Sequence, residues 1–584
     1  MTLAAAQAHG SAAIPEARHR IEPSSKSTID EALAILQDHK QEWVALDIDE
    51  RLELLELARR GVVAVAERWA YASVEGKGMT AGTSEEGEEW MAGPATVLRN
   101  ITFLMTSLRD IRDYGLPQLP KPAYARPDGQ VVAPVIPANG WDGLLFQGFS
   151  AEIWMQPDVT LANLAENQAE FYRKSSTKGK VALVLGAGNV SSIGPMDALY
   201  KLFVEGQVVL LKMNPVNEYL GPLIDEAFEA FRERGFFRVL YGGAAEGDYI
   251  SQHEAVEEIH VTGSDKTHDA IVFGVGEEGR RRKAERDLRN SKRLTCELGN
   301  VSPIIVVPGP WSQKDLDFQG VNIASSVVNN SGFNCTATRV IVQHDGWGKR
   351  DALLASLRKA FERAPDSSPY YPGAEERQKH FMAHHPDAEQ FGKRGDGHVP
   401  WTLIHHLDPD DSNEICFNVE SWCGQTSEVA LPAGSVVEYI EKAVEFCNER
   451  VWGTLACSII VHPKSLKDPT VAAAVERAIA DLRYGAVAVN HWSGLNYAMV
   501  TPTWGAFPGH TVDDIRSGQG VVHNTYMFDK PQKSVLRGPF RVWPKPAWFI
   551  DNKNAEAIGR KMTYFNADPS LMRLPGLLLA SLRG

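Results

Sequence analysis

Cysteine is scarce in this sequence, at six residues in 584. The six thiols form no CxxC pair and no Cys/His spacing typical of zinc, so we expect reduced thiols in a cytoplasmic protein, with neither a disulfide framework nor a metal site. Basic residues number 60 against 74 acidic ones, and the net charge of -14 gives no global attraction to nucleic acid or to an anionic membrane. No run of about 18 apolar residues occurs, which argues against a membrane-spanning helix.

The composition is otherwise that of a globular protein. Hydrophobic residues make up 43% and charged residues 23% of the chain, which excludes a wholly disordered, collagen-like or coiled-coil protein. The length predicts roughly two to four domains of about 150 residues each, and a chain of this size can bury a large core without disulfides.

Proline content and apolar spacing divide the first 160 residues into three parts. Residues 1–27 are polar and rich in alanine, which predicts a disordered tail. From there to about residue 116, apolar side chains recur at helical spacing. Residues 126–160 hold a Pro-Asp-Gly turn between two strand-like flanks, 130–136 and 143–155, and predict a β ribbon that projects from the body.

Strand-like and helix-like segments alternate from there to about residue 500. Short apolar runs such as 181–185 are typical of parallel strands buried on both faces. The alternation predicts two parallel sheets flanked by helices, and hence the α/β class. The expected strands are 181–185, 208–211, 239–241, 258–261, 301–307, 339–342, 457–461 and 486–489, and the expected helices are 220–234, 318–328, 435–449 and 470–482.

Four local patterns occur in a fixed order along these blocks. Taken singly, each has an ordinary explanation, because a glycine pair can be a tight turn, a lysine is usually solvated, a serine often caps a helix and a lone thiol is usually packed. The patterns are Gly186-Ala-Gly188-Asn189, Gly206-Gln-Val-Val-Leu-Leu-Lys212, Val261-Thr-Gly263-Ser264, and Glu297-Leu-Gly-Asn-Val-Ser-Pro303 followed by Gly332-Phe-Asn-Cys335.

In this order and spacing the patterns resemble those of the aldehyde dehydrogenase superfamily, over about residues 30–500, in a long and divergent form. The resemblance implies a Rossmann-like cofactor domain over 28–125 and 161–296, and a catalytic α/β domain over 297–495. It implies oligomerisation elements in the ribbon 126–160 and in the C-terminal extension 496–584. It also implies NAD or NADP as cofactor, a small-molecule aldehyde as substrate, and a homodimer or homotetramer in which the ribbon adds a strand to the partner's sheet.

The resemblance further implies a role for each matching residue. Cys335 matches the nucleophile, Glu297 the base that activates water, and Asn189 the donor to the oxyanion. An aldehyde would be oxidised through a thiohemiacetal and then a thioester on the cysteine, with hydride passing to the nicotinamide. The cofactor-binding residues implied are Lys212 for the adenosine ribose, Gly263 and Ser264 for a phosphate at a helix start, and Gly188 in the turn after the first strand.

Two departures from the family pattern concern the cofactor. In many relatives a glutamate that binds the adenosine ribose follows the lysine, whereas here Lys212-Met-Asn-Pro215 places proline at that position. The second cofactor glutamate of the family matches Glu420 in a register that is off by one, without the family's proline. The choice between NAD and NADP therefore stays open.

Three further segments have competing interpretations. The glycines at 274, 276 and 279 form a GxGxxG sequence without a strand–turn–helix frame, which we interpret as a decoy. The basic run 280–293 is typical of a solvated helix face, with a CoA or 2′-phosphate contact as the alternative. The apolar C-terminal segment 571–582 is too short to span a bilayer. It is expected to pack on the body or a neighbouring subunit rather than touch a membrane or cap a tunnel.

The sequence thus predicts an NAD(P)-dependent aldehyde dehydrogenase with a hydrolytic second step. One alternative is a CoA-acylating enzyme on the same fold, which Glu297 argues against, and another is a non-catalytic scaffold. The substrate is not readable, although tryptophan content and the apolar C-terminus favour medium to long or aromatic aldehydes over acetaldehyde. Four aromatic residues can line a pocket or belong to the core: Phe333, Trp422, Trp492 and Trp504.

Overall fold

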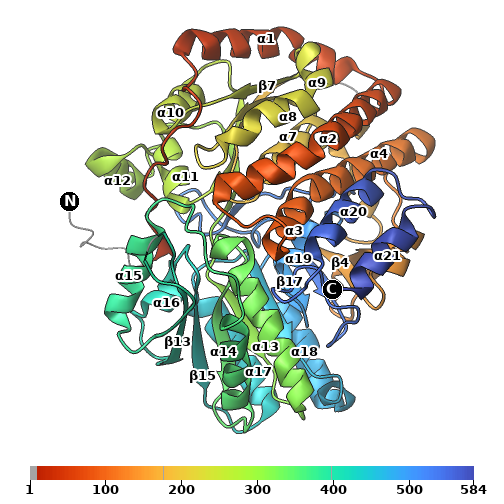
Figure 1. Ribbon diagram of the computed structural model, residues 1–584. Helices are drawn as coiled ribbons and strands as arrows, with labels where there is room; N and C mark the ends of the chain where they lie inside the picture. The colour runs from red at the N-terminus through yellow and green to blue at the C-terminus, as the bar shows by residue number, and fades with distance from the viewer. Residues whose placement is uncertain (1–8, 175–176, 396) are drawn as a thin grey trace.

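Two β-sheets form the body of the protein (Figure 1). The computed structural model describes residues 9–174, 177–395 and 397–584. One sheet has six strands in the order β18-β9-β8-β5-β6-β7, and the other has eleven in the order β12-β13-β15-β11-β10-β16-β17-β19-β4-β3-β2. Helices lie along both sheets, so the predicted α/β class is confirmed.

The six-stranded sheet has the parallel, alternating build that the sequence predicts. Pairing is parallel from β9 through β8, β5 and β6 to β7, and only β18 runs antiparallel at one edge. Its strands are β5 (Val181–Leu185), β6 (Val208–Lys212), β7 (Phe237–Leu240), β8 (Glu258–Gly263), β9 (Arg293–Leu298) and β18 (Gly518–Gln519). The intervening helices are α7 (Ile193–Phe203), α8 (Gly221–Ala227), α9 (Glu229–Glu233), α10 (Ala244–Gln252), α11 (Asp265–Val272) and α12 (Gly276–Glu285).

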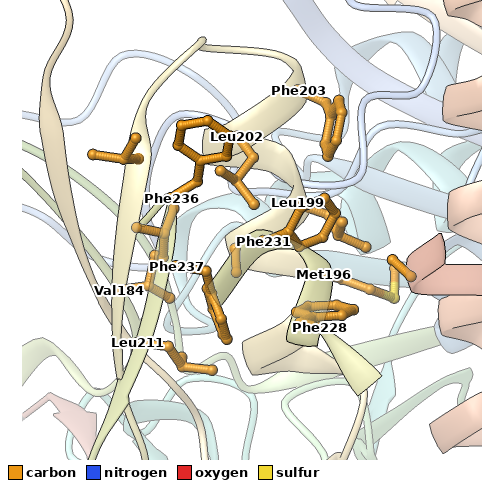
Figure 2. Packing of buried hydrophobic residues seen from close by; sticks show 14 of the residues in the cluster. Val184, Met196, Leu199, Leu202, Phe203, Leu211, Phe228, Phe231, Phe236 and Phe237 are labelled. Atoms are coloured by element: carbon orange, nitrogen blue, oxygen red, sulfur yellow. The ribbon is translucent and has the colours of Figure 1, made fainter. Parts of the chain in front are cut away.

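Aromatic rings fill the space between this sheet and its helices (Figure 2). Phe231 lies 5.8 Å from Phe203 and 5.4 Å from Phe228 between ring centroids, and Phe228 contacts Phe237 of β7 at 5.4 Å in an edge-to-face arrangement. The single helix expected over 220–234 is interrupted at Phe228, whose φ of -105° and ψ of 23° are not helical. This break separates α8 from α9 and turns the phenylalanine into the core, where burial of a ring contributes about 1.5–3 kcal/mol.

The eleven-stranded sheet carries the second block of the chain. Its central strands pair in parallel, which confirms the expected strands near 301–307, 339–342, 457–461 and 486–489. The strands of this sheet are β2 (Tyr124–Ala125), β3 (Val131–Ile136), β4 (Ser150–Met155), β10 (Ser302–Val306), β11 (Thr338–His344), β12 (Glu389–Phe391), β13 (Trp401–Leu407), β15 (Gln425–Leu431), β16 (Ala456–Ile460), β17 (Ala486–Val489) and β19 (Pro531–Arg537). Its helices include α13 (Gln313–Val328), α14 (Arg350–Phe361), α15 (Ala374–His384), α16 (Ile415–Asn418), α17 (Val436–Glu449), α18 (Pro469–Asp481) and α19 (Gly494–Ala498).

The ribbon predicted over 126–160 does not project from the body. Strand β4 pairs antiparallel with both β3 and β19, and β19 pairs in parallel with β17. The ribbon is therefore part of the chain's own large sheet. The flank expected to be one strand over 143–155 instead begins inside α5 (Gly140–Leu145) and becomes extended only at β4.

The C-terminal helices pack against the N-terminal helices (Figure 1). The N-terminal helices are α1 (Lys26–Ala45), α2 (Ile48–Lys77), α3 (Ser84–Trp90), the π-helical turn η1 (Met91–Ala95) and α4 (Thr96–Tyr114). The C-terminal helices are α20 (Ala555–Ala567) and α21 (Leu574–Leu582), and α20 lies against α3, η1 and α4. A Cβ added at Gly559 would lie 2.8 Å from Trp90 Cβ, so the absence of a side chain permits this close approach.

The C-terminal extension 496–584 forms part of the body and is not a separate oligomerisation layer. It supplies β18 to the six-stranded sheet, β19 to the large sheet, and α20 to the helical layer. The segment 571–582 packs on α20 through Leu574 and Leu577, as the preferred interpretation of that segment expects. Across the described residues, no helix is long and apolar enough to cross a membrane.

The N-terminal segment is ordered where the sequence predicts disorder. Residues 10–11 form a short strand, β1 (Gly10–Ser11), that pairs in parallel with β14 (Val419–Glu420). From there the chain runs past α11 and α10 to α1 (Figure 1). The predicted tail 1–27 is therefore wrong for residues 9–27, while residues 1–8 lie outside the described residues. We call residues 10–24 the N-terminal strap.

Candidate active site

The candidate site lies where the parallel strands of the smaller sheet end. Their carboxyl ends share one edge of the sheet, which is where ligands bind in open α/β folds. Lys212 is the last residue of β6, Gly263 is the last residue of β8, and Glu297 lies near the end of β9. The turn after β5 carries Gly188 and Asn189. Sequence positions far apart are thereby gathered on one edge.

The loop that carries Cys335 comes from the other domain, after α13. Asn330 and Ser331 adopt left-handed backbone angles, with φ of 55° and 53°, which is uncommon for residues other than glycine. The buried guanidinium of Arg339 donates to the backbone carbonyl of Gly332 at 2.6 Å. Ser302 donates its hydroxyl proton to the carbonyl oxygen of Cys335 at 2.9 Å. The surrounding contacts therefore hold this loop in a strained conformation.

One cavity of about 900 Å³ joins these two parts of the molecule. All eight site residues expected from the sequence contribute to its wall, namely Gly188, Asn189, Lys212, Gly263, Ser264, Glu297, Cys335 and Glu420. This is the volume range of cofactor and small-molecule sites. The structure thus brings the expected residues together in a single continuous space.

Cys335 and Glu297 lie close enough that each alters the pKa of the other. Burial, assisted by the neighbouring Glu297 carboxylate, raises the pKa of the Cys335 thiol well above its usual value. Burial also raises the pKa of Glu297 to about 8. One oxygen of the Glu297 carboxyl has no hydrogen-bond partner among the described residues. A thiol and a buried carboxyl of raised pKa are the pair that nucleophilic attack and proton transfer require.

Asn189 faces the nucleophile loop from the turn after β5. Its side-chain amide is 3% exposed and donates one hydrogen bond to the carbonyl oxygen of Phe333 at 2.9 Å. Asn330 in turn donates to the carbonyl oxygen of Asn189 at 3.1 Å. Because an amide carries two N–H bonds, the second donor of Asn189 remains available near Cys335.

Two lysines line the cavity. Lys212 is 8% exposed, and burial lowers the pKa of its ammonium to about 8. The Lys266 ammonium, on the first turn of α11, is buried and has no hydrogen-bond partner among the described residues. Burial lowers its pKa as well. Burial of a cation is costly, so both lysines fit an anionic or hydroxyl-rich ligand.

The glycines and Ser264 shape the cavity wall without supplying charge. A Cβ added at Gly188 would lie 2.7 Å from the Tyr371 hydroxyl, so only glycine leaves that space open. The Ser264 hydroxyl accepts from the backbone N–H of Thr267 at 3.2 Å and caps α11. Ser264 therefore caps the helix, and the positive charge at this helix start belongs to Lys266.

Glu420 closes the cavity on the side of the large sheet. It lies in β14, opposite Ser11 of the strap, and its carboxylate accepts from the backbone N–H of Asn300 at 3.1 Å. A Cβ at Gly299 would lie 2.0 Å from this carboxylate, which explains the glycine two residues after Glu297. Burial raises the pKa of Glu420 to about 7.

The aromatic residues expected at a pocket divide between cavity and core. Trp422 lines the cavity, together with Tyr371, and their ring centroids are 5.4 Å apart. Phe333 is 1% exposed and packs behind them. Trp504 is 2% exposed and lies near Cys335, whereas Trp492 donates to the carbonyl oxygen of Thr336 at 2.7 Å.

The GxGxxG sequence at 274–279 does not follow a strand. It connects α11 to α12, although Gly274 and Gly279 lie in the outer cavity wall. From the basic run that follows, Arg282 and Arg289 also line the cavity. Part of the basic run therefore lies at the cavity, and the run is not only a solvated helix face.

Several cavity residues escape the sequence analysis. Residues 11, 12 and 14–17 of the strap lie in a segment predicted to be disordered, and Lys266 resembles any solvated helix lysine. Tyr371 falls in a stretch without recognisable pattern. The one available signal is the lysine directly after Thr-Gly-Ser-Asp, at the start of a helix where anions bind.

The fold and the cavity define an α/β protein with two large sheets and a half-buried thiol, Cys335, in the wall of a single cavity. Residues 151–373 match the Aldehyde dehydrogenase family. Of the solved structures, an NAD-dependent aldehyde dehydrogenase of Sinorhizobium meliloti superposes with a TM-score of 0.56, at 16% identity, over 90% of this chain and 89% of that one. Lactaldehyde dehydrogenase of Escherichia coli gives a TM-score of 0.57 at 17% identity, over 88% and 92%.

Sequence similarity to curated proteins is confined to part of the chain. An NADP-dependent glyceraldehyde-3-phosphate dehydrogenase of Streptococcus equinus is 30% identical over 182 residues, which are 29% of this chain and 34% of that protein. A human 4-trimethylaminobutyraldehyde dehydrogenase is 29% identical over 24% of this chain and 26% of that protein. The match thus spans about a third or less of these relatives' length. The family match thus covers residues 151–373, and over most of the chain the solved aldehyde dehydrogenases share its fold.

Proposed function

We propose that this protein oxidises an aldehyde to a carboxylic acid with NAD or NADP. The observation that carries the proposal is the single cavity that has Lys212 in its wall and also contains Cys335 with Glu297 beside it. A nucleophile, a carboxyl of raised pKa and a dinucleotide-sized space are thereby joined. The solved relatives include structures titled as complexes with NADP and with NAD+.

The cavity residues fit such a cofactor. The ammonium of Lys212 suits ribose hydroxyls. The ammonium of Lys266, at the start of α11 and without a hydrogen-bond partner among the described residues, suits the pyrophosphate. Glu420, at the Cys335 end, suits the hydroxyls of the second ribose. When bound, the nicotinamide ring accepts the hydride that leaves the substrate carbon.

In the first half-reaction Cys335 is the attacking group. Its sulfur bonds to the aldehyde carbon as the thiol proton leaves toward Glu297, the carboxyl beside it. The carbonyl oxygen becomes an oxyanion, which the second N–H of Asn189 and the backbone N–H of Cys335 stabilise. Loss of hydride from this adduct leaves a thioester on Cys335.

Before the second half-reaction, Glu297 must release to solvent the proton that it took from Cys335, so that it is ionised again. It takes a proton from a water molecule, whose oxygen then attacks the thioester carbon. The carbon–sulfur bond breaks, Cys335 leaves as thiolate and the acid is released. The buried position of Glu297 suits this task, because its raised pKa makes it a stronger base than an exposed carboxylate.

The test is turnover of a panel of aldehydes with NAD and NADP, followed by absorbance of the reduced cofactor. The panel spans chain length and aromaticity, since medium to long or aromatic aldehydes are the expected substrates. Cys335→Ala should abolish turnover, whereas Cys447→Ala, a thiol on α17 remote from the cavity, should retain it. Undiminished turnover by Cys335→Ala would reject the mechanism, and a wild-type protein inactive on every aldehyde would favour a scaffold.

Transfer of the acyl group to CoA is the alternative second step. Arg282 and Arg289 in the cavity wall provide the observation that keeps it under test. Glu297 next to Cys335 favours water as the acceptor. Product analysis with and without CoA decides, because hydrolysis yields free acid in both samples.

We also infer a reducing compartment and self-association. The six cysteines are free, in keeping with a cytoplasmic location. A homodimer or homotetramer remains the expected assembly. Because β4 already pairs with β19 within the chain, a strand from a partner would have to join the ribbon at its other side, where β2 is the sheet edge. Sedimentation velocity of the purified protein measures the assembly directly.

A further inference from the structure

The adenosine end of the cavity lacks the glutamate that would follow Lys212, since Pro215 stands in its place. The N-terminal strap brings a carboxylate to the same region. We propose that Glu16 on this strap selects NAD against NADP by meeting the 2′ position of the adenosine ribose. This inference rests on the proposed function and names the cofactor that the proposed function leaves open.

The strap crosses the cavity from its inner to its outer end. Near Glu420, the Ser11 N–H donates to the Asp265 carboxylate at 3.1 Å, and the N–H of Ala12 donates to the Glu420 carbonyl oxygen at 3.2 Å. At the far end, Ile21 N–H donates to the Glu218 carboxylate at 2.9 Å. The strap is therefore fastened on both sides of the space that a dinucleotide would occupy.

Glu16 lies between these anchors and lines the cavity. One of its carboxylate oxygens accepts from the backbone N–H of Ala244, at the start of α10, at 2.8 Å. This bond fixes the side chain at the mouth of the cavity. Because a carboxylate has about four lone-pair sites, it can still accept from a ligand hydroxyl.

Three carboxylates influence the buried Lys212 ammonium, and only one of them faces the ligand space. Glu246, Glu16 and Glu218 all oppose the lowering of the Lys212 pKa by burial. Glu246 accepts from the N–H of Gly243 at 2.8 Å as part of a helix cap, and Glu218 holds the strap. Glu16 alone of the three contributes to the cavity wall.

The arginines in the wall do not offer a free site for a phosphate. Arg289 forms a two-pronged pair with Asp248, and Arg282 donates to Glu278 at 3.0 Å. Their charges are thus already matched by carboxylates on the same surface. A 2′-phosphate at this end would meet Glu16 as well, and like charges repel.

Chemistry therefore favours a 2′-hydroxyl over a 2′-phosphate. A carboxylate accepts a hydrogen bond from the ribose 2′-hydroxyl, and this is how dinucleotide folds distinguish NAD from NADP. A hydrogen bond to a charged group contributes roughly 1.5–3 kcal/mol, or about 10- to 150-fold in affinity. The same group repels the phosphate of NADP, so a single residue acts on both affinities in opposite directions.

The experiment is titration calorimetry of the full chain with NAD and NADP. The wild type should bind NAD more tightly than NADP. In Glu16→Gln the ratio of NADP to NAD dissociation constants should fall at least about tenfold, and in Glu16→Lys it should fall further. Glutamine can still accept from the Ala244 N–H, so this variant keeps the strap docked. The control is Glu22→Gln, an exposed carboxylate on the same strap that does not line the cavity.

The outcomes separate this inference from the proposed function. An unchanged ratio in both Glu16 variants, or equal weakening of both cofactors, would reject selection by Glu16 while leaving the dehydrogenase intact. A wild type that prefers NADP would reject it too. Failure of the wild type to bind either dinucleotide would reject the proposed function and this inference together.

Discussion

At the scale of single residues, the protonation state of Glu297 controls the proposed hydrolytic step. Burial raises the pKa of this carboxyl to about 8, so most of it is protonated at pH 7. A base acts only when ionised, and the hydrolysis rate should rise about tenfold per pH unit until the pH passes the pKa. The measurement is single-turnover release of acid from the acylated enzyme between pH 6 and 9.

The matched variant for this prediction is Glu297→Gln, which fills the same space and cannot ionise. It should form the thioester more slowly, because it cannot take the thiol proton, and should hydrolyse the thioester at least about 100-fold more slowly. A wild-type profile that is already level at pH 6 would show that the carboxyl titrates near its ordinary value, contrary to the effect of its burial.

Lys266 provides a second prediction at this scale. Its ammonium is buried against the cavity without a protein partner, so substitution by methionine removes charge and keeps most of the volume. Lys266→Met should weaken NAD and NADP equally, by about tenfold or more, because the pyrophosphate is common to both. Binding of adenosine alone should not change, and calorimetry with NAD, NADP and adenosine distinguishes these effects. Equal weakening of adenosine would place the lysine elsewhere.

The sequence predicted those site residues that lie in a recognisable local motif. Cys335, Glu297 and Lys212 lie in motifs with glycines at fixed spacing, and all three line the cavity. Glu16 lies in no such motif, and Lys266 is marked only by its place after Thr-Gly-Ser-Asp, because a charged residue at a helix start or in a polar tail is usually solvated. Only the folded chain shows that these two face a ligand space.

At the scale of elements, two N-terminal helices support the nucleophile loop. Lys77 at the end of α2 pairs with Glu89 of α3 at 2.6 Å, and both side chains are nearly inaccessible. The same ammonium donates to the Asn330 side chain at 2.9 Å. Asn330 is one of the left-handed residues before Cys335. The helices thus hold the loop in its strained conformation.

Breaking this buried pair should destabilise the protein and disturb the loop. Lys77→Met leaves Glu89 buried without a partner, which costs about 3–5 kcal/mol. The double variant Lys77→Met with Glu89→Leu should recover most of the lost stability, but not the bond to Asn330. Urea titration measures the first effect, and turnover measures the second. A single variant as stable as the wild type would contradict the role of the pair.

Elements with clear periodicity were predicted well, and those defined by tertiary contacts were not. The eight strands expected between 181 and 489 and helix 436–449 follow from apolar spacing, whereas β9, β13, β15 and β19 were not predicted. The strap becomes ordered through Glu218 and β14, which are distant in sequence. The helix expected over 220–234 is interrupted at Phe228, because the ring of Phe228 packs in the core. Contacts of this kind leave no mark on local sequence.

At the scale of the whole molecule, the large sheet is completed within one chain. β19, from the last 60 residues, lies between β17 and the ribbon strands. The C-terminal part of the chain therefore joins the ribbon to the large sheet, although the sequence pattern predicts them as separate units. A ribbon can be recognised from turns and alternation, but its pairing partner cannot. The register of β4 against β19 depends on residues nearly 400 positions apart.

Several buried carboxyls also link the stability of the whole molecule to pH. Glu88 is the most useful to test, because it lies outside the proposed chemistry and accepts from the Asn330 N–H at 2.8 Å. Burial raises its pKa from 4.5 to about 8. Between these values the unfolded chain releases a proton that the folded chain retains, so the free energy of unfolding falls as the pH rises.

Glu88→Gln should therefore stabilise the protein more at pH 8 than at pH 5. Glutamine fills the same space, accepts the same hydrogen bond and cannot ionise. The variant therefore keeps the free energy of unfolding that the wild type loses as the pH rises, about 1.4 kcal/mol per unit of pKa shift. Thermal unfolding of both proteins at the two pH values measures the difference. Glu53→Gln, at an exposed position on α2, should give the same small change at both. A gain for Glu88→Gln that is equal at both pH values would mean that Glu88 does not titrate in this window.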